Sequence, residues 1–218
     1  MLTARVFTDF YVKACDDKLL KVAYRLGYSN VACEELKTSP PQGGPSVYSK
    51  VVIRVGSVAE AKRALASLSY KKYLITLLPE EVEPARWACH DSRVDTILLT
   101  PENIEVFDKK QFSTMKYYAK PLELQLKHLV EANESIRSAI YRRLNLAVRY
   151  KVGVVVGSGA SSWVELVHPY SIVKLLATTY DFPQDLAILS ITDIPRQIMT
   201  MKERSLTSSS EESLSISR

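Results

Sequence analysis

The sequence predicts an α/β barrel of about seven parallel strands. Segments with strand character alternate with segments of helical periodicity along residues 1–203, a pattern typical of a parallel sheet covered by helices. The run 152–156 (VGVVV) has no polar alternation, as expected of a strand buried on both faces. Most of the other strands lack the polar pattern of an open edge, which favours closure into a barrel. An open doubly wound sheet is the alternative.

The strands are recognised by their β-branched and aromatic residues and by the turn residues between them. We expect them at residues 6–12, 30–34, 50–55, 73–78, 94–99, 122–127 and 152–156. Leu122, Leu124 and Leu126 alternate with polar residues, which is the period of a strand. The loop at 38–46 holds three prolines and two glycines and separates the second strand from the third.

Helices are predicted where apolar residues recur at spacings of three and four. We expect them over 17–26, 58–68, 80–90, 111–119 and 134–148, then from Pro169 onward, and over 185–190 and 195–203. Residues 204–218 (RSLTSSSEESLSISR) are rich in serine, and their apolar residues are scattered singly. We therefore expect a single barrel domain at 1–203, followed by a disordered tail at 204–218.

Charge is concentrated in one part of the chain. The formal net charge is +5, yet residues 109–151 alone hold ten basic and three acidic residues. Such a concentration is typical of a face that binds a polyanion, with nucleic acid as the first candidate. The alternative is a pair of solvated helices whose cations serve solubility or form ion pairs.

The candidate RNA contacts form three groups in and after this segment. Arg142 and Arg149 lie seven residues apart on one helical face, and Lys151 follows. Lys116 and Lys120 form a second group. Tyrosines at 117, 118, 141 and 150 interleave with these cations, a mixture that suits stacking on RNA but is also common in ordinary cores.

The third group belongs to the loop Gly157–Ser162 (GSGASS), where Ser158 and Ser161 are the candidates. A small-residue loop after a parallel strand can bind a phosphate through its backbone N–H groups. This one lacks the Lys-Ser/Thr of a nucleotide-binding P-loop. A tight turn that needs small residues explains the same pattern.

The other residues that could carry chemistry are acidic residues of the strands, the histidines and the cysteines. Asp9, Asp95 and Glu123 lie at or near strand positions and could converge in the mouth of a barrel. The three histidines lack the spacing of metal ligands, so we expect no metal site and no cofactor in this chain. The three cysteines include no CxxC pair, and we expect reduced thiols. With no long apolar run and no signal peptide at the amino terminus, we expect a cytoplasmic protein that is not associated with membranes.

The central run Arg142–Leu166 resembles the core of the archaeal ribonuclease P protein component 3 family. Its members carry a basic helix ending in a step like Arg149-Tyr150-Lys151, then an apolar strand and an S-G-A loop. The likeness extends to the Phe-Thr-Asp-Phe start at residues 7–10, to Arg93-Val94-Asp95, and to 192–198 (TDIPRQI). It covers about residues 4–203.

This resemblance implies a TIM-barrel-like fold of seven parallel strands and a specific role. Members are protein subunits of ribonuclease P, the ribonucleoprotein endonuclease that removes the 5′ leader of precursor tRNA. There the RNA, with its Mg²⁺, carries out the chemistry. The subunit pairs with protein component 2, alongside other subunits, to support the catalytic RNA.

One departure concerns related barrels, the metal-dependent phosphoesterases, whose first strand reads Asp-x-His-x-His. The matching residues here are Asp9, Tyr11 and Lys13, so both histidines are replaced. The resemblance therefore favours an RNA-binding subunit with no catalytic residues of its own, inactive in isolation. The alternative is a barrel phosphoesterase or other metabolic enzyme that uses the loop 157–162 for a substrate phosphate.

Overall fold

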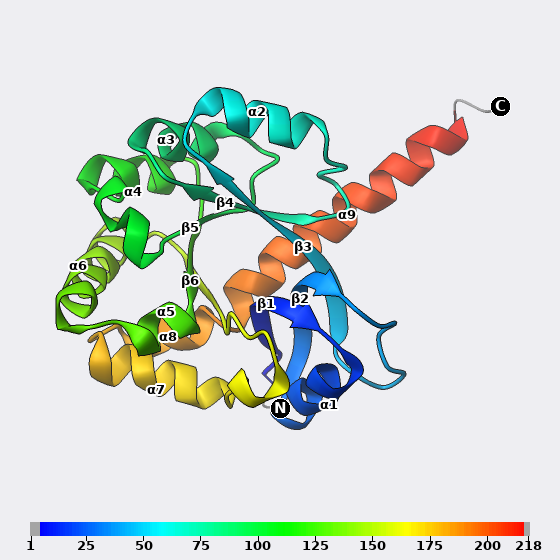
Figure 1. Ribbon diagram of the computed structural model, residues 1–218. Helices are drawn as coiled ribbons and strands as arrows, with labels where there is room; N and C mark the ends of the chain where they lie inside the picture. The colour runs from blue at the N-terminus through cyan, green and yellow to red at the C-terminus, as the bar shows by residue number, and fades with distance from the viewer. Residues whose placement is uncertain (1–4, 216–218) are drawn as a thin grey trace.

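The computed structural model describes the backbone of residues 5–215 and side chains as far as Arg204. Within these residues, seven parallel strands form one sheet whose order follows the sequence (Figure 1). The strands are β1 (Phe7–Cys15), β2 (Tyr28–Leu36), β3 (Ser46–Val55), β4 (Leu74–Pro79), β5 (Thr96–Leu98), β6 (Leu122–Gln125) and β7 (Val154–Gly157). A doubly wound sheet would reverse its strand order part-way, so the predicted barrel is confirmed.

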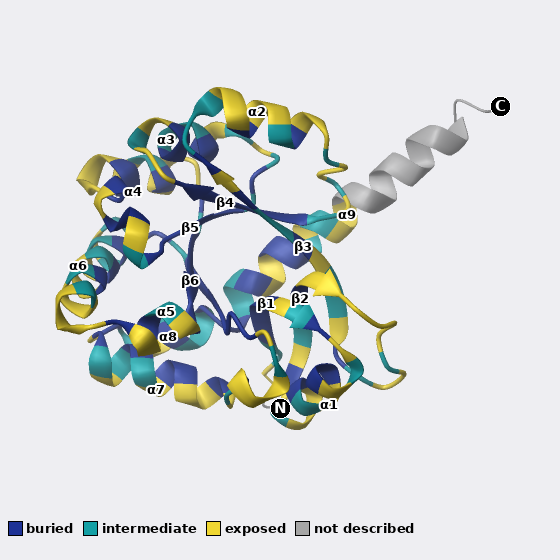
Figure 2. Cartoon of the chain, in the orientation of Figure 1, coloured by how far each residue is buried: buried dark blue, intermediate teal, exposed yellow. Residues whose placement is uncertain are grey.

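The helices surround the strands, and their outer faces are exposed while β4, β5 and β6 are buried (Figure 2). They are α1 (Asp17–Arg25), α2 (Val58–Ala66), α3 (Val82–His90), α4 (Lys109–Tyr117), α5 (Leu126–Glu131), α6 (Glu134–Tyr150), α7 (Pro169–Thr179), α8 (Gln184–Leu189) and α9 (Asp193–Ser215). Two short 3-10 helices, η1 (Pro101–Val106) and η2 (Trp163–Glu165), follow β5 and β7. We call the end of the barrel where the strands begin the amino end, and the opposite end the carboxyl end.

Two segments fill the gap between β1 and β7. Near the middle of β7, the turn after α8 inserts its backbone: Thr8 N donates to Ile191 O at 2.8 Å, and Val156 N donates to Ser190 O at 3.1 Å. At the carboxyl end, Gly159 N donates to Tyr11 O and Lys13 N donates to Ala160 O. The ring thus closes without an eighth strand.

Helix α9 covers the amino end. Its residues Ile198 and Met199 are buried in one cluster with Phe10, Leu74 and Val155, which come from three different strands. Because these side chains come from β1, β4 and β7, the start of α9 acts as a plug for the barrel interior.

Helix α9 extends into the segment for which the sequence predicts disorder. It begins at Asp193 and continues to Ser215, and the disorder of 204–218 stays a prediction. A helix anchored by buried residues in its first turns can be extended at little further free-energy cost. Residues 216–218, the last of the expected tail, lie outside the described residues.

The end of β6 differs from the prediction as well. The strand stops at Gln125, and Leu126 and Lys127 begin α5. All four residues of β6 are buried, including Glu123 and Gln125. The period of two is therefore real, but its polar residues lie inside the barrel and not on a solvent face.

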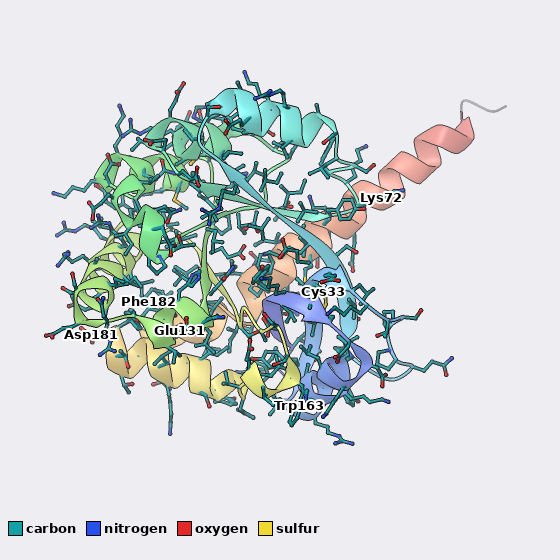
Figure 3. The ribbon with its side chains drawn as sticks, in the orientation of Figure 1. Cys33, Lys72, Glu131, Trp163, Asp181 and Phe182 are labelled. Carbon is teal, nitrogen blue, oxygen red and sulfur yellow. A yellow bond between two sulfur atoms is a disulfide. The ribbon has the colours of Figure 1, made fainter. Side chains whose placement is uncertain are left out.

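The expectation of three free thiols is wrong. Cys15 and Cys33 form a disulfide, with their Cα atoms 6.0 Å apart, and Cys89 is a buried free cysteine. Cys33 is labelled in Figure 3 on β2, the strand that pairs with β1. Sequence spacing could not reveal this pairing, because it depends on the register of two neighbouring strands. In the described part of the chain, no helix is long and apolar enough to span a membrane.

Candidate nucleic-acid interface

The basic segment 109–151 runs from α4 through β6 and α5 to the end of α6, and most of its cations are exposed. The exposed ones are Lys109, Lys110, Lys116, Lys127, Arg137, Arg142, Arg149 and Lys151. Of the three acidic residues in the segment, Glu123 is fully buried. The two that remain exposed, Glu131 and Glu134, are too few to balance these cations. A net positive surface therefore lies along α4 and α6, which pack against each other.

Three of the predicted contacts lie at the amino end of the barrel. Lys116 is in the last turn of α4, and Arg149 is in the last turn of α6. Lys151 caps α6 in the left-handed conformation, with φ of 56°. The strands that follow these two helices are neighbours, because Leu122 N donates to Gly153 O at 2.8 Å. The fold thus brings together residues that are 35 positions apart in the sequence.

Arg142 lies half-way along the exposed face of α6 and donates to Ser138 Oγ at 2.9 Å. Its neighbour Arg143 is the residue engaged in an ion pair, with Glu105 at 3.1 Å. Among the described residues, neither Arg142 nor Arg149 forms an ion pair. The ion-pair alternative is therefore not supported for these two arginines.

Lys120 differs from the other predicted contacts because it is buried. Its ammonium group donates to the carbonyl oxygens of Asp91 and Val94. Burial lowers the pKa of Lys120, while the nearby carboxylate of Asp95 opposes that shift. This lysine ties the start of β6 to the turn before β5, which is a structural role.

Ser158 and Ser161 lie at the carboxyl end, opposite the cations of the amino end. Four successive N–H groups of their loop already have acceptors within the protein: Ser158 N with Asp9 Oδ1, Gly159 N with Tyr11 O, Ala160 N with Ser158 Oγ and Ser161 N with Glu165 Oε2. A phosphate-binding loop needs N–H groups that are free to donate. The loop therefore has the geometry of a tight turn, which is the alternative interpretation of its small residues.

Gly157 shows why this turn needs small residues. A Cβ atom at this position would lie 2.2 Å from Tyr11 N and 2.7 Å from Tyr11 Cα. The end of β7 therefore contacts the backbone of β1 directly, and only glycine fits.

The three acidic strand residues do not converge. Asp9 is buried beside the loop 157–162, whereas Asp95 lies at the amino end and pairs with Lys202 of α9 at 2.8 Å. Glu123 is inside the barrel, where its Oε2 accepts from Lys50 Nζ at 2.8 Å and from the hydroxyls of Thr76 and Thr96. Among the described residues, no group of three or more His, Cys, Asp or Glu could hold a metal ion.

In the first strand, Tyr11 and Lys13 stand at the positions where metal-dependent barrels carry histidines. The hydroxyl of Tyr11 donates to Glu34 Oε2 at 2.6 Å, and Lys13 is exposed. Burial raises the pKa of Asp9 to about 6, although N–H groups of Ser158 and Tyr11 donate to its Oδ1. Its Oδ2 is buried without a hydrogen-bond partner.

A protein-family model described as RNase P subunit p30 matches residues 6–206. The chain belongs to the RNase P subunit p30 family. The match covers nearly the whole region in which the sequence resembled ribonuclease P protein component 3, so that recognition is confirmed.

Relatives of this p30-family chain agree with the match. Ribonuclease P protein component 3 of Aeropyrum pernix is 28% identical over 170 residues, which are 73% of this chain and 80% of that protein. One chain of the cryo-EM structure of archaeal ribonuclease P with mature tRNA superposes with a TM-score of 0.74 at 15% identity, covering 89% of this chain and 91% of that one.

The same barrel is found in enzymes. A prolidase solved with N-methylphosphonate-L-proline has a TM-score of 0.61 at 12% identity, covering 90% of this chain and 74% of that one. At such low identity, both structural likenesses concern the fold alone.

Sequence reasoning missed one constellation in this p30-family barrel, the buried pair of Lys50 and Glu123. Lys50 Nζ also donates to Phe10 O at 3.0 Å and lies 3.9 Å from the centre of the Phe10 ring. A buried charge is tolerated when it is paired and hydrogen-bonded. The signal available in the sequence was a lysine opening an otherwise apolar strand, which reads equally well as a solvated strand end.

Proposed function

We infer that this chain is a protein subunit of ribonuclease P that binds the catalytic RNA and supports removal of the 5′ leader from precursor tRNA. The observation that carries this proposal is the family match over residues 6–206. The proposed partners are the ribonuclease P RNA, protein component 2 and other protein subunits, and precursor tRNA through the assembly. The proposed location is the cytoplasm.

Binding is proposed to occur through the exposed cations of α4 and α6. Lys116, Arg142, Arg149 and Lys151 are exposed, and no ion pair within the described residues neutralises them. Each phosphate that such a cation neutralises releases condensed counterions, so affinity should depend steeply on salt. These contacts position the RNA without reading its sequence.

The chain itself is proposed to hold no metal and no cofactor, with Mg²⁺ bound by the RNA of the holoenzyme. The barrel-enzyme alternative needs a phosphate site in the loop 157–162, and the N–H groups at positions 158–161 are already engaged. We expect the purified chain to hydrolyse neither phosphoesters nor precursor tRNA. Metal-dependent turnover that survives repurification and is lost in Asp9→Asn would contradict this.

The test of RNA binding is the double variant Arg142→Ala/Arg149→Ala. Its affinity for RNA should fall for all sequences, and the slope of log affinity against log salt should flatten by about one to two units. Filter binding of ribonuclease P RNA at several salt concentrations measures both quantities. Folding should be unchanged, because both side chains are exposed.

The matched control is Lys62→Ala/Arg63→Ala, which removes two exposed cations from α2, outside the basic segment. It should bind as the wild type does. Reconstitution with the RNA and component 2 then tests the role in processing. An α6 double variant with wild-type affinity and salt slope would remove α6 from the RNA-binding surface.

A further inference from the structure

Three aromatic side chains form an exposed stack at the amino end of the barrel. The ring of His90, the last residue of α3, lies nearly parallel to the ring of Tyr118, with centroids 4.6 Å apart and an interplanar angle of 27°. The ring of Tyr117 meets Tyr118 edge-on, with centroids 4.8 Å apart. We call these three residues the aromatic stack.

The aromatic stack is open to solvent, unlike most large rings of this protein. Tyr117 is 81% exposed and Tyr118 is 44% exposed, whereas Tyr28 and Tyr180 are 1% exposed. Helix α4 buries Phe112 and Met115, and because adjacent helical residues point about 100° apart, Tyr117 and the residue that follows it cannot both join them in the core. Helix α4 ends at Tyr117, and Ala119 then turns the chain with φ of 50°.

The charges around the stack favour a polyanion. Lys116 precedes Tyr117 and is exposed in the last turn of α4. Asp91, which follows His90, is neutralised by Arg93 through bonds of 2.9 and 2.7 Å to its two carboxylate oxygens. Lys151 ends the neighbouring helix α6 at the same end of the barrel. Accessible ring faces therefore lie in a positive field.

We propose that the aromatic stack binds unpaired bases of RNA, with Lys116 contacting the adjoining phosphates. Aromatic rings flanked by cations are how proteins bind single-stranded nucleic acid, because every base has a face that can stack. Bases inside an A-form duplex are covered by their neighbours and cannot use such a site. The proposal rests on the RNA-binding function proposed above, and it adds a preference for single-stranded segments.

The test compares Tyr117→Leu/Tyr118→Leu with Tyr117→Phe/Tyr118→Phe in the full chain. The probes are a short single-stranded RNA carrying 2-aminopurine and a duplex of the same sequence. The leucine variant should lose about tenfold in affinity for the single strand, together with the fluorescence quenching that stacking causes. The phenylalanine variant should keep both. Affinity for the duplex and the salt slope should be unchanged in both variants.

Tyr24→Leu is the matched control, because Tyr24 is 56% exposed on α1, away from the basic segment. It should bind as the wild type does. If the leucine variant binds the single strand like the wild type, or loses single strand and duplex equally, base stacking is overturned while RNA binding stands. If the wild-type chain binds neither probe, the proposed RNA-binding function falls, and the stacking proposal falls with it.

Discussion

The two ends of the barrel differ in how far the protein itself uses their polar groups. At the carboxyl end, the N–H groups of residues 158–161 bond to acceptors in β1, in η2 and within the loop. At the amino end, Lys116, Arg149 and Lys151 are exposed and Tyr117 presents a bare ring. Barrel enzymes place their active sites at the carboxyl end. In this chain, the carboxyl end is closed where β7 meets β1, and the cations that end α4 and α6 lie on the opposite side.

Figure 3 marks residues from both regions. Trp163 lies in η2 beyond the carboxyl end, where Lys18 of α1 covers its ring at 4.0 Å. Lys72 lies just before β4 at the amino end. The RNA-binding surface proposed here thus lies on the outer helices α4 and α6, away from the end where barrel enzymes place their active sites.

The largest effect is expected from Gly157→Ala, which would break the closed carboxyl end. A methyl group there would overlap the backbone of Tyr11, and we expect the free energy of unfolding to fall by roughly 3 kcal/mol or more. Urea denaturation measures it. Gly56→Ala is the control, because its methyl group would meet the nearest atoms at 3.6 Å. Stability within about 1 kcal/mol of wild type in Gly157→Ala would show that the junction can relax.

A smaller effect is expected from Asp9, whose carboxylate accepts from that same loop. Burial raises its pKa from 3.8 to about 6. Between these values the folded state holds a proton that the unfolded state has released, so stability falls as pH rises from about 4 to 6 and is level above that. The loss of stability over this pH range is about 3 kcal/mol.

Asp9→Asn should reduce this pH dependence, because asparagine does not titrate, and leave the part due to Asp95, whose pKa burial also raises. The amide oxygen can still accept from Ser158 N. Thermal or urea unfolding at pH values from 4 to 7 measures the slope. Asp185→Asn, at an exposed position on α8, should keep the wild-type profile. An Asp9→Asn variant with the wild-type slope would place the titration elsewhere.

The smallest effect is expected from ending the chain after Arg204, a change that tests which residues of α9 hold the plug at the amino end. The contacts that hold α9 come earlier: Ile198 and Met199 in the core, Lys202 with Asp95, and Glu203 with Tyr48. The melting temperature should change by no more than about 2 °C. A loss of several degrees would mean that residues beyond 204 contribute to the plug.

Local patterns predicted most of this fold. The apolar face of α6 and the uninterrupted apolar run of β7 depend on residues close together in the sequence, which is why the strand count and the barrel could be predicted. The burial of polar residues could not be predicted in this way. The same alternation that marks a solvent-facing strand places Glu123 inside the barrel, and its partner Lys50 lies 73 positions away.

The candidate site was predicted in part for the same reason. Charge density identified α4 and α6, because it needs no knowledge of pairing. It could not tell that Lys120 is buried, since that depends on the carbonyl groups before β5. The small-residue pattern of the loop 157–162 added Ser158 to the candidate contacts, although a parallel strand places the loop after β7 and the helix end before β7 at opposite ends of the barrel.

The backbone of Ser190 and Ile191 between β1 and β7 has a consequence for biosynthesis. Thr8 and Ile191 are joined by a hydrogen bond across 183 positions of sequence. During translation, β1 emerges first, and its outer edge lacks this partner until almost the whole domain has been made. An unpaired strand edge can associate with other chains, and contacts of such long range slow folding. The nascent chain therefore passes through an open sheet that closes only once Ser190 and Ile191 have been made, and until then its free edge is exposed to aggregation and to chaperones.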